Sequence, residues 1–442
     1  MRIKALVLCH MRTVSPKHKL STQVRMAGNL SLTPFGLQDL PAEISPPIKS
    51  NSVTKFDVKT VRNDALNTRI VVHSRFPQLV QRFLEHKRHH GSSLEKAYYQ
   101  SGWTWQQQTA RLIEKRSLVF MGGSDFTVLR SGEHIGGASR EWDRVGTDEE
   151  KLNKHLFLKD YLSYDEIMLS SLIGVSGPSF FINDGRRVNM GRPGKDGEFE
   201  PRGVIVGLVG ARFERPDRMD SVFVLRDDGN PRQHPELSNI FLDFFGQRKN
   251  SSVEFDEDIY KARIRITADI LFHEAAQRAK SAGKKAYVYV VGLGLGVWAQ
   301  LGPKQSQLYV QAFIQSLSQL GDDLSDIGTV EFAWIDDVPG FKKRSMVLGA
   351  SQTVVDFKFS RRNPAEKLHG AEKNHLLVLS YAWDGNAFPG NEYWVGSLAA
   401  TGDPAAACMS TISELHNPLV NPGFLSRIEV LDGTSESSTE ES

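Results

Sequence analysis

Residues 286–298 read AYVYVVGLGLGVW, and the prediction of the fold starts from them. Valine and tyrosine dominate the first six positions, which favours a buried strand, and a loop with three glycines follows. Pro303 is expected to open a helix that runs to about Leu320, and a second strand is expected at 330–335. A strand, a glycine loop, a helix and another strand together predict an α/β sheet.

The segments on either side add further strands and helices to this unit. A helix is expected from Asp256 to Lys280, because apolar residues recur every three or four positions and Gly283 follows a basic last turn. Ser176-Gly177-Pro178 predicts a turn. The other expected elements are a short helix at 164–171, strands at 179–182, 203–209, 354–359 and 376–381, and a last helix from Asp403-Pro404 to a point before Asn417-Pro418.

Changes in composition divide the chain into four parts. Residues 1–65 are poorly patterned and contain several prolines, which predicts an extended N-terminal arm. Residues 66–150 carry apolar side chains at helical spacing, with a break at Gly91-Ser92-Ser93, and predict a helical accessory region. Residues 151–431 hold the α/β unit, and the acidic tail at 432–442 is expected to be disordered.

Composition and charge argue against several classes of protein. Hydrophobic residues make up 40% and charged residues 24% of the 442 residues, which is ordinary globular usage. Lys and Arg number 54 against 52 Asp and Glu, so the net charge of +2 argues against nucleic-acid binding. The longest nearly apolar stretch, 287–299, is too short to span a membrane. Cys9 and Cys408 are the two cysteines, which predicts no disulfide framework and suits the reducing conditions of the cytoplasm.

The histidines in this sequence do not form a recognisable metal-binding motif. His273-Glu274 lies on an expected helix, but no second histidine follows four residues later, so the zinc-protease pattern is absent. His89-His90 stands in a basic stretch and is expected to form a solvated face. We therefore expect no metal site.

The glycine loop at 292–296 could bring the backbone close to a ligand. Exposed amide groups in such a loop can hold a diphosphate, and Val297 and Trp298 would add an apolar wall. The same glycines also fit a strand end that packs closely against a neighbouring segment. Their GxGxG spacing differs from the dinucleotide fingerprint GxGxxG, and Asp336 follows the loop by forty residues instead of about twenty. A nicotinamide-dependent oxidoreductase is therefore the less favoured alternative.

Acidic and aromatic side chains lie close together in a second loop, residues 381–403, which reads YAWDGNAFPGNEYWVGSLAATGD. Burial among aromatic rings would raise the pKa of Asp384, Glu392 and Asp403 toward values that suit acid–base catalysis. A pair of these carboxylates could also bind a guanidinium group. Two structural interpretations remain open, because Asp384-Gly385-Asn386 could form a turn and Asp403 could cap a helix that begins with Pro404.

Several of these segments resemble a known family. VYVVGLGLGVW at 288–298 is similar to the diphosphate-binding loop of macrodomains, in particular those related to poly(ADP-ribose) glycohydrolase. The block LSYAWDGNAFPGNEYW at 379–394, followed by GDPAAA, resembles the divergent macrodomain of MavL-type arginine-specific ADP-ribosylhydrolases. YDEIMLSSLIGVSGP at 164–178 and YKARIRITADIL at 260–271 also resemble that group, so the likeness covers about 158–421.

The resemblance implies a fold and an activity. The fold would be a macrodomain-like mixed sheet flanked by helices, with a permuted strand order and residues 151–431 as the catalytic domain. The activity would be hydrolysis of the N-glycosidic bond that links ADP-ribose to an arginine of a protein, without a cofactor. PGNE at 389–392 replaces the glycine run of poly(ADP-ribose) glycohydrolases, and no Gln-Glu-Glu is present, which disfavours cleavage between ribose units. The substrate would be an ADP-ribosylated protein, and the resemblance suggests ubiquitin, although no residue here indicates it.

The resemblance also assigns roles to residues of both loops. Asp384 would orient the guanidinium, and Glu392 or Asp403 would activate water or hold the ribose hydroxyls. The implied ADP-ribose-binding residues are Asn386, Gly390, Asn391, Gly292, Gly294, Gly296, Val297 and Trp298. This assignment requires the two loops to border one cleft. A protein that binds ADP-ribose without cleaving the bond stays an alternative.

Overall fold

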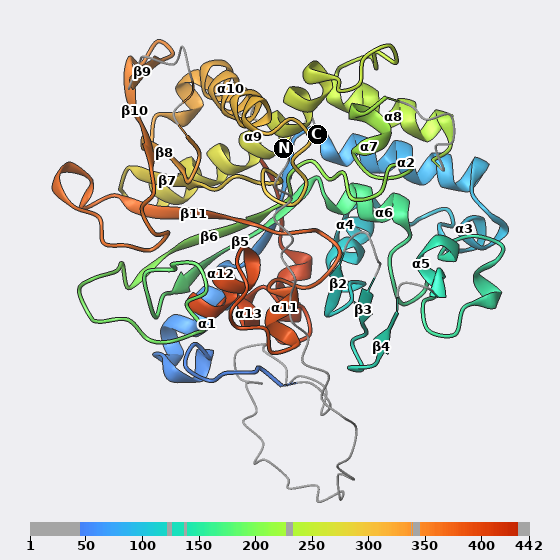
Figure 1. Cartoon of the computed structure of the whole chain (residues 1–442), viewed down its shortest axis with the longest axis horizontal. Coiled ribbons are helices and arrows are strands. Elements are labelled where there is room, and N and C mark those ends of the chain that lie inside the picture. The colour runs from blue at the N-terminus through green and yellow to red at the C-terminus, as the bar shows by residue number, and fades with distance from the viewer. Residues whose placement is uncertain are drawn as a thin grey trace, which may run out of the picture. The chain divides into compact units, whose positions relative to one another are not determined.

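The structure is a computed structural model that describes residues 45–121, 126–136, 139–226, 233–336, 338 and 345–431. Nine strands of this described part form one large sheet (Figure 1). In spatial order they are β12 (Ile428–Leu431), β1 (Arg69–His73), β5 (Ile173–Phe180), β6 (Arg202–Leu208), β11 (Leu376–Ala382), β7 (Ala286–Val290), β8 (Ile327–Ala333), β10 (Thr353–Ser360) and β9 (Ser345–Leu348). A small separate sheet contains β2 (Val119–Met121), β3 (Phe126–Val128) and β4 (His134–Ile135).

The large sheet mixes parallel and antiparallel strands. The neighbours β6, β11, β7, β8 and β10 are parallel to one another, whereas β5 is antiparallel to both β1 and β6, and β9 is antiparallel to β10. The predicted mixed α/β sheet is thus confirmed. Because parallel strands have their carboxyl ends at one edge, the loops that follow β6, β11 and β7 begin side by side.

Helices cover both faces of this sheet (Figure 1). α9 (Glu257–Ser281) and α10 (Pro303–Leu320) lie on one face, and α1 (Val58–Asn67), α12 (Asp403–Met409) and α13 (Ile412–Leu415) lie on the other. A further group lies beside β1 and β12, and it comprises α2 (Phe76–His90), α3 (Ser93–Tyr98), α4 (Trp105–Glu114), α6 (Tyr164–Ser170) and α8 (Pro235–Phe245). The short helices are α5 (Glu141–Arg144), α7 (Ser221–Val224) and α11 (Asn391–Trp394).

Local sequence explains where the central elements begin and end. All five residues of β7 are buried, as expected for an apolar strand that helices cover on both faces. Asp256 caps α9, because its Oδ1 accepts hydrogen bonds from the amides of Asp258 and Ile259 at 3.2 and 3.1 Å. α10 extends from Pro303 to Leu320, as predicted.

The turn predicted at Ser176-Gly177-Pro178 is wrong, because these residues lie within β5. β5 begins at Ile173, not at the predicted Ser179. Proline lacks the amide hydrogen that a central strand needs. Here β1 pairs with β5 only from Ile173 to Ser176, so Pro178 lies beyond that pairing and has a strand partner on the β6 side alone.

The last predicted helix is interrupted. α12 ends at Met409 and α13 begins at Ile412, because the backbone of Ser410 is extended and forms a bridge with Phe181. Asp403 does not cap α12 either: Gly402 occupies the cap position with a φ of 76°, and Asp403 is the first residue of the helix. The carboxylate of Asp403 is therefore free for other contacts.

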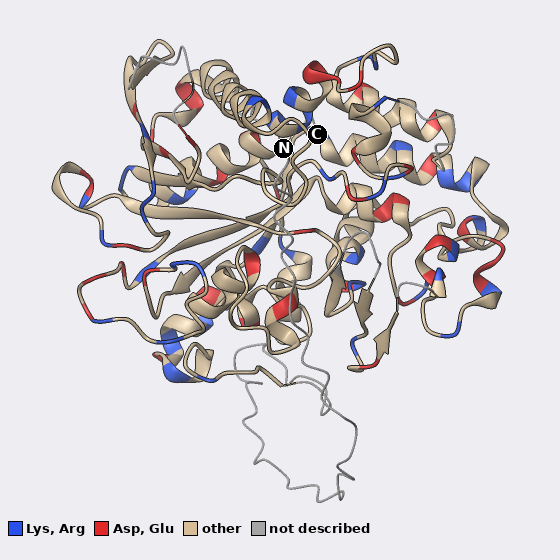
Figure 2. Cartoon of the chain, viewed as in Figure 1, with Lys and Arg blue, Asp and Glu red and all other residues tan. Residues whose placement is uncertain are grey.

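The predicted division of the chain into four parts stays a prediction. β1 comes from the predicted helical accessory region, yet it pairs with β5 and β12 in the large sheet. The first 44 residues of the predicted arm and the tail at 432–442 lie outside the described residues. None of the described helices meets the length and hydropathy needed to cross a bilayer. In Figure 2, acidic and basic residues are interspersed along the helices and loops in view.

Candidate active site

A cavity of about 1070 Å³ opens at the carboxyl ends of β7 and β11. These two strands are parallel neighbours, with Tyr289 opposite Leu379, so their following loops leave the sheet at the same edge. We call residues 291–302 the glycine loop and residues 383–403 the acidic loop. Both loops line the cavity, which meets the requirement that the sequence analysis set for a shared cleft.

The glycine loop is anchored to the elements around it. The amide of Val291 donates to Oγ of Ser380 on β11 at 3.0 Å, and its carbonyl accepts a bond from the Tyr309 hydroxyl of α10 at 2.8 Å. Leu293 is fully buried. These contacts hold the start of the loop to both the sheet and the helix that covers it.

The glycines in this loop do different things. Gly294 has a φ of 76°, and a Cβ there would lie 2.8 Å from the carbonyl oxygen of Ala211, so this glycine permits close packing against the loop after β6. A Cβ on Gly296 would meet nothing within 4 Å. Within the described part of the chain, the amides of Gly294 and Gly296 donate to no protein acceptor, which leaves them available to a ligand.

The other predicted residues of the glycine loop differ in exposure. Gly292 and Trp298 line the cavity, and so does Val297, whose residue surface is 92% exposed. The Trp298 ring lies against the guanidinium of Arg212, at 4.9 Å from its centre. Val297 therefore stands at the open side of the cavity, whereas Trp298 packs against a buried charge.

Asp384 both shapes the acidic loop and lines the cavity. Its Oδ1 accepts the amides of Asn386 and Ala387 at 2.9 and 3.2 Å, which is the turn that the sequence analysis left open. Its Oδ2 accepts the side-chain amide of Asn391 at 2.9 Å. Asp384 therefore forms the turn with one carboxylate oxygen and also lines the cavity.

Asp403, the last residue of the acidic loop, binds the backbone in the middle of that loop. Its Oδ2 accepts the amides of Gly390 and Asn391 at 2.8 and 3.4 Å. Together with Asp384, it therefore fixes the segment that directly precedes Glu392. Asn391 lines the cavity, whereas Gly390 does not and contributes through its backbone.

Asp384 and Asp403 both accept hydrogen bonds that fix the loop, and Glu392 differs from them. It is half-buried and lines the cavity, and its Oε2 accepts no hydrogen bond within the residues described. Burial, assisted by the charge of Asp384, raises the pKa of Glu392 to about 7. At neutral pH this group is therefore divided between its acid and its base form.

The two aspartates also have shifted pKa values. Burial raises the pKa of Asp403 well above its ordinary value, and the charges of Glu392 and Asp384 add to this effect. Burial raises the pKa of Asp384 as well, while the positive charge of Arg212 opposes the shift. Three acidic groups in one desolvated site repel one another, so the cavity favours fewer than three negative charges.

Arg212 is a site residue that the sequence analysis missed. It is 2% exposed, forms an ion pair with Glu214, and donates through Nη1 to the Asp384 carbonyl at 2.5 Å and to Oδ1 of Asn386 at 2.6 Å. Asn386 does not line the cavity, so its role is to hold Arg212. Because Arg212 follows β6, the strand next to β11, the rule that strand ends carry function would have found it.

Arg116 is a second missed residue, and no motif in the sequence indicates it. Its guanidinium lies 3.8 Å from the ring centre of Trp383, and its Nη1 and Nη2 are buried without a hydrogen-bond partner in the described chain. Burial lowers the pKa of Arg116 to about 9, and the nearby charge of Asp384 opposes that shift. Arg116 thus places positive charge behind the start of the acidic loop.

Comparisons with known proteins show which family this chain is similar to. A family model described as ADP-ribosylhydrolase MavL-like matches residues 42–234 and 236–431. The chain is 36% identical over 431 residues to a Drosophila melanogaster protein named ADP-ribosylarginine hydrolase CG3568. The match covers 88% of this chain and 81% of that relative. It is 35% identical to ADP-ribosylarginine hydrolase CG2909 of the same species, over 87% of this chain and 83% of that relative.

Proposed function

The chain belongs to the MavL-like ADP-ribosylhydrolase family, and from that premise we propose that it removes ADP-ribose from ADP-ribosylated arginine in proteins. One observation carries the proposal. A loop with unoccupied backbone amides and a loop with three buried or half-buried carboxyl groups line the same cavity. The amides suit the diphosphate of ADP-ribose, and the carboxyl groups suit a cationic guanidinium and the water that attacks the ribose.

The reaction replaces one bond at the anomeric carbon. The bond between C1″ of the ribose and a guanidinium nitrogen breaks, the oxygen of water bonds to C1″, and a proton of that water passes to the departing nitrogen. Positive charge develops on the ribose ring in the transition state, as in glycoside hydrolysis. Nearby carboxylates stabilise that charge, and a base is needed to take the proton from water.

Glu392 is our candidate for this base. No described residue donates a hydrogen bond to its Oε2, and its pKa of about 7 leaves a large fraction ionised at neutral pH. After it accepts the proton of water, the same group can donate that proton to the departing nitrogen. Asp403 uses its Oδ2 to hold Gly390 and Asn391, so we assign it to positioning the loop.

Asp384 remains our candidate for orienting the guanidinium of the substrate. Its three hydrogen bonds to the protein fix the direction of the carboxylate, and each carboxylate oxygen can accept more than one bond. The glycine loop would bind the diphosphate through the amides of Gly294 and Gly296. Binding energy from that remote contact would hold C1″ in place beside Glu392.

Three finer points of the expected function remain proposals. We propose that the catalytic unit is related to macrodomains, because a glycine loop after a central parallel strand lines the ligand cavity. The resemblance to the MavL type supports ubiquitin as one modified acceptor. The buried thiol of Cys408, which forms no disulfide, supports a cytoplasmic location.

The test uses the full chain and two peptides. One peptide carries ADP-ribose on an arginine, and the other carries it on a serine, while release of free ADP-ribose is followed by chromatography. We expect release from the arginine peptide and much slower release from the serine peptide. Tight binding of ADP-ribose in calorimetry without any release would identify a binding protein instead, and equal release from both peptides would remove the arginine specificity.

A further inference from the structure

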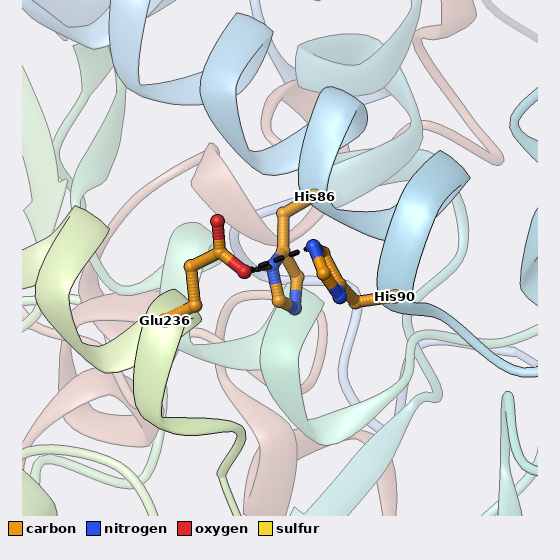
Figure 3. Close-up of side chains that lie close together, drawn as sticks. All are labelled: His86, His90 and Glu236. Atoms are coloured by element: carbon orange, nitrogen blue, oxygen red, sulfur yellow. Dashed lines mark ion pairs between the residues drawn. The ribbon is translucent and has the colours of Figure 1, made fainter.

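Two histidines and a glutamate meet between α2 and α8, and none of the three lines the cavity (Figure 3). His86 and His90 lie one turn apart on α2, and Glu236 is the second residue of α8. Oε2 of Glu236 lies 2.9 Å from Nε2 of His90 and 3.8 Å from Nδ1 of His86. The three candidate ligand atoms all lie within 4.8 Å of one another.

His86 cannot be explained as part of a surface ion pair. It is 5% exposed, and its Nδ1, which faces Glu236, has no hydrogen-bond partner among the described residues. Glu236 is already satisfied by the exposed His90, so the pair leaves a buried polar nitrogen without a partner. Buried nitrogens are normally paired, and such an exception requires an explanation.

The chemistry of His86 suits a metal ligand. Its Nδ1 is buried and faces the carboxylate of Glu236, so a cation placed between the two groups could take a lone pair from each. Histidines four residues apart on a helix present both rings to one side, as in many zinc sites.

A fourth group stands next to these three. His234 caps α8 through its Nδ1, which accepts the amide of Glu236 at 3.3 Å. Its ring centre lies 4.9 Å from that of His86 and 5.3 Å from that of His90. His234 does not belong to the group whose ligand atoms lie within 4.8 Å of one another, so the fourth position of a tetrahedral ion is left to water.

We propose that α2 and α8 hold a divalent metal ion, Zn²⁺ by its ligand chemistry, between Nδ1 of His86, Nε2 of His90 and the carboxylate of Glu236. Two neutral imidazoles and one carboxylate are a ligand set that zinc commonly takes. The ion would complete the coordination of the buried Nδ1 and connect the two helices. It would act as a structural clip, separate from the hydrolase cavity. No zinc pattern is visible in the sequence because Glu236 comes from a different helix, about 150 residues after His86.

The test is a zinc titration of the full chain, with a chromophoric chelator as competitor. We expect one tight site in the wild type. Loss of a residue that merely supports a ligand costs roughly 10–100-fold in metal affinity, so loss of a ligand should cost more. His90→Ala and Glu236→Gln are the variants of choice, because both side chains are exposed and their replacement leaves no cavity in the core.

His89→Ala is the matched control, since His89 is an exposed histidine next to His90 on the same helix and belongs to no such cluster. We expect its zinc affinity to equal that of the wild type. Cobalt absorption bands typical of tetrahedral coordination should appear in the wild type and in His89→Ala, and vanish in the other two variants. Absence of a tight site in the wild type, or the same affinity in all four proteins, would overturn the proposal. Neither result bears on the hydrolase activity.

Discussion

The glycine loop and the acidic loop leave neighbouring strands at the same edge of the sheet, yet they are held in place in opposite ways. Partners outside the glycine loop, Ser380 and Tyr309, fix its beginning and leave amides within it unoccupied. In the acidic loop, two of its own carboxylates, those of Asp384 and Asp403, hold Asn391, while Arg212 adds a contact from outside. Asp384 therefore both holds the acidic loop in shape and lines the cavity, and Asp403 holds the same segment. Glu392 differs from them, because it is a candidate for catalysis that does not hold the loop.

Glu392→Gln should separate chemistry from shape most sharply. We expect turnover of the arginine-linked substrate to fall by about 10²–10⁴-fold, which is the usual contribution of a general acid or base. The melting temperature should stay level or rise, because the change removes a partly buried charge while keeping the shape of the side chain. Glu198→Gln, an exposed change outside the cavity, is the control and should leave turnover unchanged. Wild-type turnover in Glu392→Gln would exclude this residue as the base.

Asp403→Ala should lower both the stability of the fold and the turnover. The change leaves the buried amides of Gly390 and Asn391 without their acceptor, which costs about 1–3 kcal/mol of stability for an unsatisfied buried group. Turnover should fall as well, because the segment before Glu392 loses its anchor. Asp322→Ala is the matched control, since that carboxylate accepts the amides of Ala350 and Ser351 in a loop away from the cavity. A drop in turnover without any change in melting would place Asp403 in the chemistry instead.

Two substitutions in the glycine loop should separate the effect of close packing from the effect of ligand binding. Gly294→Ala places a Cβ 2.8 Å from a backbone oxygen at a positive φ, so we expect a loss of about 1–3 kcal/mol. Gly296→Ala meets open space and should leave the melting temperature near that of the wild type. Its effect should be a weaker affinity for ADP-ribose, measured by calorimetry. Equal melting temperatures for the two variants would contradict the close packing described here.

The pH profile should show the smallest effect of this series. Because the pKa of Glu392 is raised to about 7 and the base must be ionised, the rate should fall roughly tenfold for each pH unit below 7. The raised pKa of Glu392 also makes the stability of the fold depend on pH, in the direction opposite to that of the rate. A carboxyl group with a raised pKa stabilises the fold at low pH, and that contribution is lost as the pH rises through 7. A rate that is flat from pH 5.5 to 8 would rule out this role for Glu392.

Much of this arrangement could be predicted from local patterns. The strand at 286–290 and the helix from Pro303 to Leu320 were predicted because each has a strong period and a clear start or stop residue. The shared cleft was implied by the resemblance to MavL-type hydrolases, and it lies at the carboxyl ends of two parallel strands. The turn at Ser176-Gly177-Pro178 was predicted wrongly, since the pairing that tolerates Pro178 depends on how far β1 extends, which local sequence does not encode.

Contacts between distant segments account for what the sequence did not reveal. Asp403 before Pro404 looked like a helix cap, and its actual contacts with Gly390 and Asn391 depend on the path of the loop between them. Arg212 and Arg116 are buried charges that meet the acidic loop from elsewhere in the chain. Arg212 could have been found because it follows the predicted strand at 203–209, whereas the position of Arg116 follows from tertiary packing, for which a single sequence carries no local signal.

The most direct test of the central claim is a crystal structure of the Glu392→Gln variant with an arginine-linked ADP-ribosyl peptide. We expect the diphosphate within hydrogen-bond distance of the amides of Gly294 and Gly296. We also expect C1″ beside residue 392 and the guanidinium against Asp384. A diphosphate bound away from the glycine loop, or a C1″ that faces away from residue 392, would contradict that claim.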